Sequence, residues 1–302
     1  MFFDTYDTPV FRPPSEARSF ILRVTRGCAH NKCTYCNMYS HRGGVPFQIL
    51  SDEEISRQIA LAVHYGKESV RRVFLADGDA LVLPTVKLLK ILQALRENFP
   101  RLQRVASYAA PKDILRKSEE ELRQLKEAGL QLLYYGMETG DDITLKAVNK
   151  GVDAAEAIEA GRRVTASGMK LSLMVILGLA GKEGSQRHAL ETAKAINIIQ
   201  PTMLSALCLM LYRGSELLDQ FENGEFDPLS PQGLMEELHL MMQHIDLPQD
   251  KHCLFRSNHV SNYVQLAGTL PKDKDRLLRE IAYSAQQLGK LKSWDVYNNT
   301  EY

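Results

Sequence analysis

Short apolar runs alternate along this chain with amphipathic segments, and this alternation constrains the fold more than any other feature of the sequence. Several amphipathic segments carry helix start signals, such as the capping boxes Ser51 with Glu54 and Ser118 with Glu121. Strands that are apolar on both faces and separated by single helices indicate a parallel sheet with crossover helices. Six such strands are expected, at residues 19–27, 71–79, 104–110, 130–140, 169–181 and 202–212.

The length of the repeat predicts how far a barrel can extend. A closed barrel of eight strand–helix units would fit in about 250 residues, but the repeat fades after residue 213 of the 302-residue chain. We therefore expect an α/β fold, a partial (β/α)6 TIM-like barrel formed by residues 1–215, with its core over 18–215.

The remaining segment, 216–302, has a different pattern. Amphipathic helices are expected at 228–245 and 271–290, with a mixed polar strand or loop at 253–268. No linker sets this segment apart as an independent domain. We expect a C-terminal extension of helices and strand that packs on the barrel or closes it.

Charge and hydropathy narrow the function classes. Lys+Arg and Asp+Glu are both 37, so the formal net charge is zero and gives no global attraction to nucleic acid or anionic lipid. The longest apolar runs, 171–181 and 203–212, are shorter than the ~20 residues of a membrane-spanning helix. The N-terminal residues have no basic start before an apolar core, so no secretory signal is expected. We expect a cytoplasmic location, where thiols stay reduced.

Three of the five cysteines, Cys28, Cys33 and Cys36, lie in one loop directly after the first expected strand. In a barrel this is the C-terminal end of the strand, where active sites collect. A reducing compartment disfavours a disulfide, and a thioredoxin-type pair would leave Cys28 unexplained. A structural zinc site needs four ligands, and His30 and His41 are close enough in sequence to be considered for the fourth.

Three thiolates also suit an iron–sulfur cluster. A cubane cluster is usually held by four thiolates; with three, one iron keeps an open coordination position, where substrate chemistry takes place on a metal. A plain electron carrier would be expected to have a fourth thiolate nearby. Cys208 and Cys253 are expected to be buried small hydrophobes, too few for an auxiliary cluster.

The spacing Cys-x4-Cys-x2-Cys after the first strand, with Tyr35 before the third cysteine, resembles the cluster motif of radical S-adenosylmethionine (SAM) enzymes. The first gap is one residue longer than in the commonest form of that motif. Later strand ends resemble the branch that contains oxygen-independent coproporphyrinogen oxidases, elongator and methylthiotransferase enzymes, and hydrogenase-maturation enzymes. The resemblance covers about residues 18–215 and includes FLADGDAL (74–81), YYGMETGDDITLKAVNKG (134–151) and LMVILGLAGKEG (173–184).

The resemblance implies a [4Fe-4S] cluster on the three loop cysteines and a SAM site at the strand ends. Gly78 and Asp79 replace a Gly-Gly-Glu-type turn that binds the SAM amino group, and Glu138 takes the place of a SAM-contacting glutamate. Lys150 takes the place of a basic residue that could pair with the SAM carboxylate. The implied SAM-binding residues are Tyr35, Gly78, Asp79, Glu138, Lys150 and Gly178.

Simpler roles exist for several of these residues. Asp79 could cap the helix expected near Pro84, Glu138 could be a turn residue, and Lys150 could be a solvated charge at a helix end. Gly178 is at least a glycine that permits close backbone approach.

The resemblance also implies a mechanism and partners. A reductant such as flavodoxin or ferredoxin would supply an electron for cleavage of SAM to methionine and a 5′-deoxyadenosyl radical, which abstracts hydrogen from a substrate; such an enzyme is expected to be oxygen-sensitive. A small molecule or peptide is the expected substrate. The alternatives are RNA modification or a non-catalytic protein that binds zinc or carries electrons.

The segment 255–263, FRSNHVSNY, is dense in hydrogen-bonding groups. We expect Arg256 and Asn258 to contact the substrate. The alternative is that the polar side chains here satisfy backbone groups at an open edge of the barrel.

Overall fold

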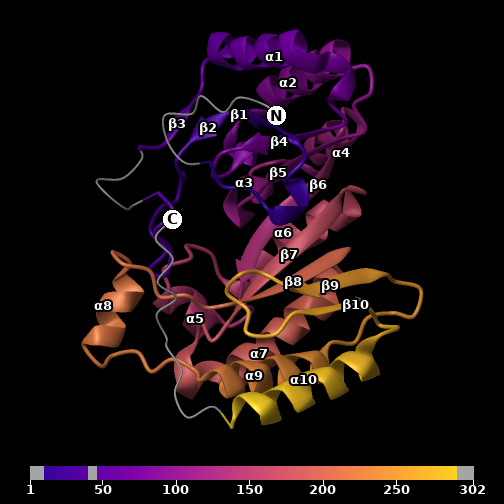
Figure 1. Cartoon of the computed structure of the whole chain (residues 1–302). Coiled ribbons are helices and arrows are strands. Elements are labelled where there is room, and N and C mark those ends of the chain that lie inside the picture. The colour runs from indigo at the N-terminus through magenta and orange to yellow at the C-terminus, as the bar shows by residue number, and fades with distance from the viewer. Residues whose placement is uncertain (1–9, 40–45, 291–302) are drawn as a thin grey trace. The chain divides into compact units, whose positions relative to one another are not determined.

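The computed structural model describes residues 10–39 and 46–290, which divide into two compact units (Figure 1). The first unit contains residues 10–31, 46–135 and 163–171, and the second contains 32–39, 136–162 and 172–290. The main sheet has eight strands in the order β1-β4-β5-β6-β7-β8-β9-β10.

Parallel strands form the centre of the first unit. β1 pairs with β4, β4 with β5, and β5 with β6, all in parallel. These strands are buried along nearly their whole length, as continuous apolar runs predict. The strands are β1 (Phe20–Arg23), β4 (Arg72–Ala76), β5 (Arg104–Tyr108) and β6 (Leu130–Glu138), with a separate antiparallel pair β2 (Thr25–Arg26) and β3 (Gln48–Ile49).

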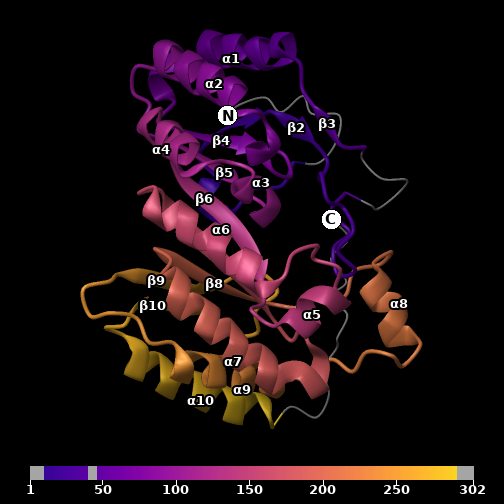
Figure 2. The ribbon, with the colours of Figure 1, turned by 180° about the vertical axis from the view of Figure 1, so that it is seen from behind.

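Helices of the first unit begin where their sequence signals lie. Ser51 and Ser118 each accept a hydrogen bond from the amide three residues on, and the glutamates there return the bond, so both predicted capping boxes are confirmed. α1 packs against α2, and α2 against α4, as Figure 2 shows. The helices are α1 (Asp52–Gly66), α2 (Thr85–Asn98), α3 (Pro111–Leu115) and α4 (Glu119–Glu127), with short turns η1 (Pro14–Glu16), η3 (Lys67–Ser69) and η4 (Ala80–Val82).

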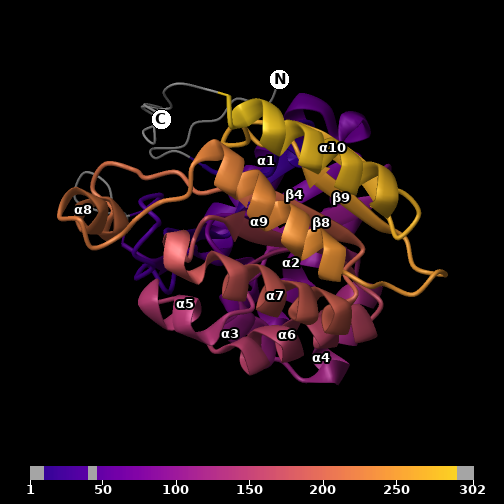
Figure 3. The same ribbon diagram turned by 90° about the horizontal axis from the view of Figure 1, so that it is seen from below.

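The second unit is built on β7, β8, β9 and β10. β7 pairs with β8 and β8 with β9 in parallel, whereas β9 and β10 are antiparallel. α7, α9 and α10 lie side by side, with α9 in the middle (Figure 3). The elements are α5 (Asp142–Ala147), α6 (Ala154–Ala166), β7 (Lys170–Leu177), α7 (Gly181–Ile199), β8 (Met203–Cys208), α8 (Glu216–Glu222), α9 (Pro231–His244), β9 (Cys253–Ser257), β10 (Leu266–Leu270) and α10 (Lys274–Leu288).

The predicted α/β fold is confirmed, and all six expected strands form. The expected extension contains helices α9 and α10 as well as β9 and β10. Parallel pairing continues to β9, one strand beyond the predicted repeat. The repeat is not visible there in the sequence because β9 alternates buried and exposed residues and has no continuous apolar run. The short helices α3, α5 and α8 were not predicted. The domain boundary at residue 215 stays a prediction.

No helix within residues 10–39 and 46–290 has both the length and the apolar character needed to cross a membrane.

Candidate functional site

Gly78 brings the turn after β4 against the start of the cysteine loop within the first unit. Its φ of +40° is a conformation that residues with side chains rarely adopt. A Cβ atom at this position would lie 2.2 Å from the carbonyl oxygen of Gly27 and 3.2 Å from Cα of Cys28. Glycine is therefore required for this close approach. The loop itself is turned by a bond at 3.4 Å from the amide of Asn31 to the Cys28 Sγ.

A buried ion pair supports the same turn. Arg23 Nη2 lies 3.0 Å from Asp77 Oδ2, and the two side chains are 2% and 0% exposed. The hydroxyl of Thr25 donates to the Asp77 carbonyl at 2.7 Å, and the Gly78 amide donates to Asp77 Oδ1 at 3.0 Å. The sequence analysis missed this pair, although an arginine inside an apolar strand was a signal for a buried partner.

Asp79 is committed to the backbone around it. Its Oδ1 accepts from the amide of Leu81 at 2.7 Å, and its Oδ2 accepts from the amide of Ala110 at 2.8 Å. The residue is 4% exposed. Burial, with a further contribution from neighbouring Asp113, raises the pKa of Asp79 well above its usual range. Asp79 thus acts as a cap, for η4 and not for the helix near Pro84, and its contact with SAM stays a prediction.

The second half of the cysteine loop is fixed within the second unit. The amide of Thr34 donates to the carbonyl of Val148 at 3.1 Å, and the Thr34 carbonyl accepts from the amide of Leu217 at 2.9 Å. The amide of Cys36 donates to the Cys33 carbonyl at 3.1 Å. Backbone bonds on both sides of Thr34 therefore hold these two cysteines against the ends of α5 and α8.

Tyr35, Glu138 and Lys150 come together beside Cys33 and Cys36. Lys150 Nζ lies 2.9 Å from Glu138 Oε1, and 3.4 Å from the hydroxyl of Tyr35 to which it donates. The side chains of Lys150 and Glu138 are only 13% and 12% exposed. The suggestion that Lys150 is a solvated helix-end charge is therefore wrong, because its side chain is largely shielded from solvent and its ammonium group forms an ion pair. Glu138 ends β6 with a φ of +68°.

The protonation states of Lys150 and Tyr35 follow from burial and charge. Burial lowers the pKa of Lys150, but Glu138 and the neighbouring thiol groups outweigh it, and the pKa is raised overall. Burial also raises the pKa of Tyr35, and the negative charge of Glu138 adds to that shift. At neutral pH Lys150 is therefore an ammonium group and Tyr35 is a neutral phenol.

Gly178 follows β7 with a φ of +81°. Its amide donates to Glu237 Oε1 at 2.7 Å, and a Cβ atom here would lie 2.7 Å from Leu234 Cδ2. The glycine lines a small hollow with Leu209 and Tyr263, among others. The prediction that Gly178 permits close backbone approach is confirmed, whereas its contact with SAM stays a prediction.

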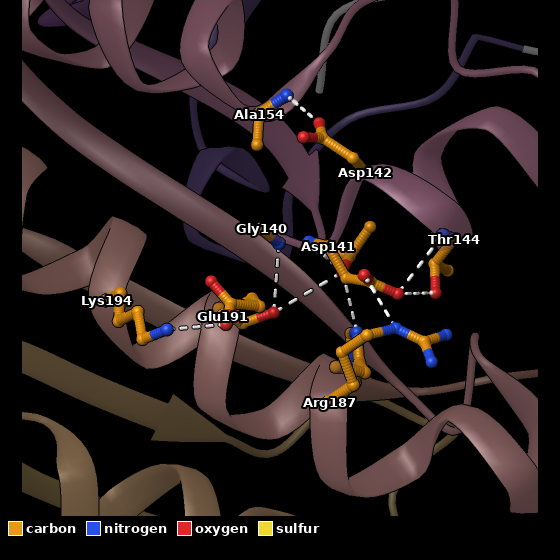
Figure 4. A network of polar contacts seen from close by, with 11 residues as sticks. Gly140, Asp141, Asp142, Thr144, Ala154, Arg187, Glu191 and Lys194 are labelled. Atoms are coloured by element: carbon orange, nitrogen blue, oxygen red, sulfur yellow. Dashed lines mark hydrogen bonds and ion pairs between the residues drawn. The ribbon is translucent and has the colours of Figure 1, made fainter.

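The loop after β6 is fastened to α7 by polar contacts that the sequence analysis missed (Figure 4). The amide of Gly140 donates to Thr192 Oγ1 at 3.0 Å. Asp141 accepts from the amide of Thr144 at 3.1 Å and from Arg187 Nε at 2.9 Å. Although burial opposes it, these bonds lower the pKa of Asp141. The available sequence signal was Asp141, because aspartate is a preferred N-cap residue and here it begins the short helix α5.

The expected substrate residues lie on and after β9. Arg256 and Asn258 are both exposed. Arg256 Nη1 donates to the carbonyls of Phe255 at 2.7 Å and Gly268 at 3.3 Å, and Asn262 Nδ2 donates to the Ala206 carbonyl at 3.0 Å. The alternative role, satisfying backbone groups near a strand edge, is therefore observed for Arg256 and Asn262. Substrate contact by Arg256 and Asn258 stays a prediction.

The donor chemistry of the cysteine loop fits an iron–sulfur cluster. Cys28, Cys33 and Cys36 form no disulfide and have intermediate exposure. Cys208 and Cys253 are buried, and burial raises the pKa of each to about 12, so they stay protonated. Among the described residues no three His, Cys, Asp or Glu side chains are grouped as a preformed metal site. His41, considered for zinc, lies outside the described residues, and His30 belongs to no such group.

Comparison with known proteins identifies relatives of this chain. The model of the Radical SAM superfamily matches residues 22–193. An uncharacterized protein of Methanocaldococcus jannaschii (MJ0486) is 24% identical over 210 residues, which cover 67% of this chain and 64% of the relative. The chain therefore spans less than two thirds of the length of that relative.

Solved structures share the fold. Coproporphyrinogen III oxidase from Escherichia coli, described as a radical SAM enzyme, matches with a TM-score of 0.53 and 13% identity over 90% of this chain and 78% of its own. Methylornithine synthase matches with a TM-score of 0.51 and 16% identity over 92% and 83%. The archaeal Elp3 from Methanocaldococcus infernus matches with a TM-score of 0.51 and 14% identity over 90% and 63%. At these identities the likeness shows the fold alone.

Proposed function

Since this chain belongs to the radical SAM superfamily, whose members are enzymes that use a [4Fe-4S] cluster and SAM, we propose that Cys28, Cys33 and Cys36 hold the cluster. We also propose that the chain cleaves SAM reductively. The bound cluster would supply one electron, so that SAM gives methionine and a 5′-deoxyadenosyl radical that takes hydrogen from a substrate. The protein's own residues would bind and orient the cofactor and exclude water.

The ion pair of Glu138 with Lys150 is the observation that carries this proposal. The amino acid end of SAM has one ammonium and one carboxylate group. Lys150 and Glu138 lie 2.9 Å apart and neutralise one another. SAM could replace each partner by a group of the same charge, with its ammonium on Glu138 and its carboxylate on Lys150, so both side chains would stay paired.

Tyr35 supports this position for the cofactor. Its hydroxyl accepts from Lys150 at 3.4 Å, and it stands between two of the proposed cluster ligands in sequence. The same side chain therefore links the ligand loop to the ion pair within one unit. The contacts of SAM with Tyr35, Gly78, Asp79 and Gly178 are part of the proposal.

Partners and substrate follow the same reasoning. Enzymes of this superfamily generally need an external reductant, and a flavodoxin or ferredoxin is proposed for this chain. We propose a small molecule or peptide as substrate, contacted by Arg256 and Asn258. Residues 216–302 are proposed as an extension of the barrel.

Anaerobic reconstitution with iron and sulfide tests the proposal. We expect about four irons per chain and formation of methionine and 5′-deoxyadenosine from SAM after reduction with dithionite. Cys33→Ser should abolish both, whereas Cys208→Ser, which removes a buried thiol, should retain both. A chain that takes up one zinc ion and leaves SAM intact would show that the proposed function is wrong.

A further inference from the structure

A buried polar chain connects the ends of β6 and β7 within the second unit. Glu237 of α9 accepts from the Gly178 amide at 2.7 Å through Oε1 and from the Ser185 hydroxyl at 2.6 Å through Oε2. His188 Nε2 of α7 lies 3.6 Å from Glu237 Oε1. On its other side, His188 Nδ1 lies 2.7 Å from Thr139 Oγ1. The side chains of Glu237 and His188 are 0% exposed.

His188 connects Thr139 to Glu237. Thr139 Oγ1 accepts from the amide of Asp141 at 3.0 Å and lies 3.4 Å from Thr192 Oγ1. The donor in its contact with His188 Nδ1 is set by the tautomer of the imidazole. His188 Nε2 faces Glu237 and has no hydrogen-bond partner within the described residues. The imidazole therefore contacts the Thr139 hydroxyl on one side and faces the carboxylate on the other.

Stability alone is a weak reason for a carboxylate at this position. Glu237 lies on the apolar face of α9, among buried residues such as Leu234, Leu238 and Met241. An apolar side chain could fill such a position without the cost of removing a charge from water. Each end of the polar chain instead reaches a backbone position with positive φ or its immediate neighbour. Gly178 has a φ of +81°, and Thr139 follows Glu138, which has a φ of +68°.

We propose that Glu237 and His188 are positioning residues for SAM, which hold the backbone at Gly178 and beside Glu138 in the conformation that the cofactor contacts. This inference rests on the proposed function, in which Glu138 and Gly178 bind SAM. Neither positioning residue is proposed to touch SAM or the cluster. The helix that supplies Glu237 belongs to the segment 216–302, so this extension would contribute to SAM binding through the Gly178 amide.

Substitutions at Glu237 separate positioning from a general structural role. Glu237→Leu leaves the Gly178 amide without its acceptor, and the affinity for SAM should fall about tenfold, as expected for one lost hydrogen bond to a charged group. Glu237→Gln should restore affinity to within about twofold, because its carbonyl can face Gly178 and its amide can donate to Ser185. Glu236→Leu changes the exposed neighbour on the same helix and is the matched control.

The measurements use the anaerobically reconstituted chain. SAM affinity is read by calorimetry, and iron content and the electron paramagnetic resonance spectrum of the reduced cluster without SAM should match the wild type. The apparent KM for SAM should rise about tenfold in Glu237→Leu, with kcat at saturating SAM within about twofold. Amide hydrogen exchange of peptides that contain Gly178 or Thr139 should be faster before any ligand is added.

Two outcomes overturn the inference. Unchanged SAM affinity in Glu237→Leu, with normal iron content, shows that Glu237 does not position the site; equal losses in the Leu and Gln variants show a purely structural role. If Glu237→Leu does not take up iron, SAM affinity is compared between His188→Leu and His188→Asn. The asparagine keeps a polar group at the Nδ1 position, so this pair gives the same test as Leu and Gln at Glu237. A wild-type chain that takes up iron but does not bind SAM refutes the proposed function itself.

Discussion

Replacing Lys150 by methionine should leave Glu138 as an unpaired carboxylate in an environment largely shielded from solvent. Lys150 Nζ and Glu138 Oε1 are 2.9 Å apart, and the two side chains are 13% and 12% exposed. With an effective dielectric constant of about 20, the direct attraction at this distance is roughly 6 kcal/mol. Most of this attraction is offset by the removal of both charges from water, so the pair itself adds little net stability.

Removal of one partner of the pair destabilises the fold more than removal of both. An uncompensated charge in a buried pair costs about 3–5 kcal/mol. We therefore expect Lys150→Met to lower the free energy of unfolding by about 3–5 kcal/mol at pH 7.

Urea unfolding of the reconstituted chain at pH 7, followed by circular dichroism, measures this loss. The double variant Glu138→Gln/Lys150→Met removes both charges and should regain most of the stability at pH 7. It should not regain SAM affinity, because both partners of the amino acid end are gone. Unchanged stability of Lys150→Met, or a double variant no more stable than Lys150→Met, would refute the reasoning.

Other predictions concern the turn after β4 and the strand β9. Because the pKa of Asp79 is raised, its contribution to stability is present below the ordinary aspartate pKa of about 3.9 and is lost as pH rises through the raised value. Urea midpoints of the wild type should therefore fall with rising pH between about pH 4 and pH 8, and Asp79→Asn should remove this dependence on pH. Gly78→Ala should lower the iron content after reconstitution, because the added Cβ would lie 2.2 Å from the Gly27 carbonyl oxygen at the start of the cysteine loop. The control is Gly224→Ala, at a position with φ +76° and no atom of the described residues within 4 Å of the added Cβ. It should keep full iron content and lose only about 1 kcal/mol of stability. Arg256→Ala and Asn258→Ala should keep the iron content and lose substrate turnover; normal turnover in both would contradict their proposed role.

The fold was predictable wherever burial left a simple pattern. Strands buried on both faces, such as Phe20–Arg23 and Lys170–Leu177, appear in the sequence as continuous apolar runs. β9 was expected only as a strand or loop, because its buried residues alternate with exposed ones and Leu254 is 41% exposed. Parallel pairing of β9 with β8 could not be deduced, since register depends on neighbours that the local pattern does not specify.

The site was predictable only for residues that a local motif contains. Glu138 and Lys150 came from one motif, and the structure pairs them. Glu237 lies 59 residues from Gly178 along the chain, and no local pattern joins them. The available signal was a charge on the buried stripe of an amphipathic helix, where an acidic side chain has to find a hydrogen-bond donor. Such a signal predicts that a partner exists and leaves its identity open.

The two acidic residues proposed for SAM differ in what binding would require of them. Asp79 is 4% exposed and already accepts two backbone hydrogen bonds, so a new contact through its carboxylate would displace the amide of Leu81 or Ala110. Glu138 would exchange one ammonium group for another, with no buried group left unpaired. The free energy cost of reorganisation is therefore smaller at Glu138. The ammonium group of SAM should depend more on Glu138 than on Asp79, and the turn after β4 should contribute mainly through the backbone that Gly78 leaves accessible.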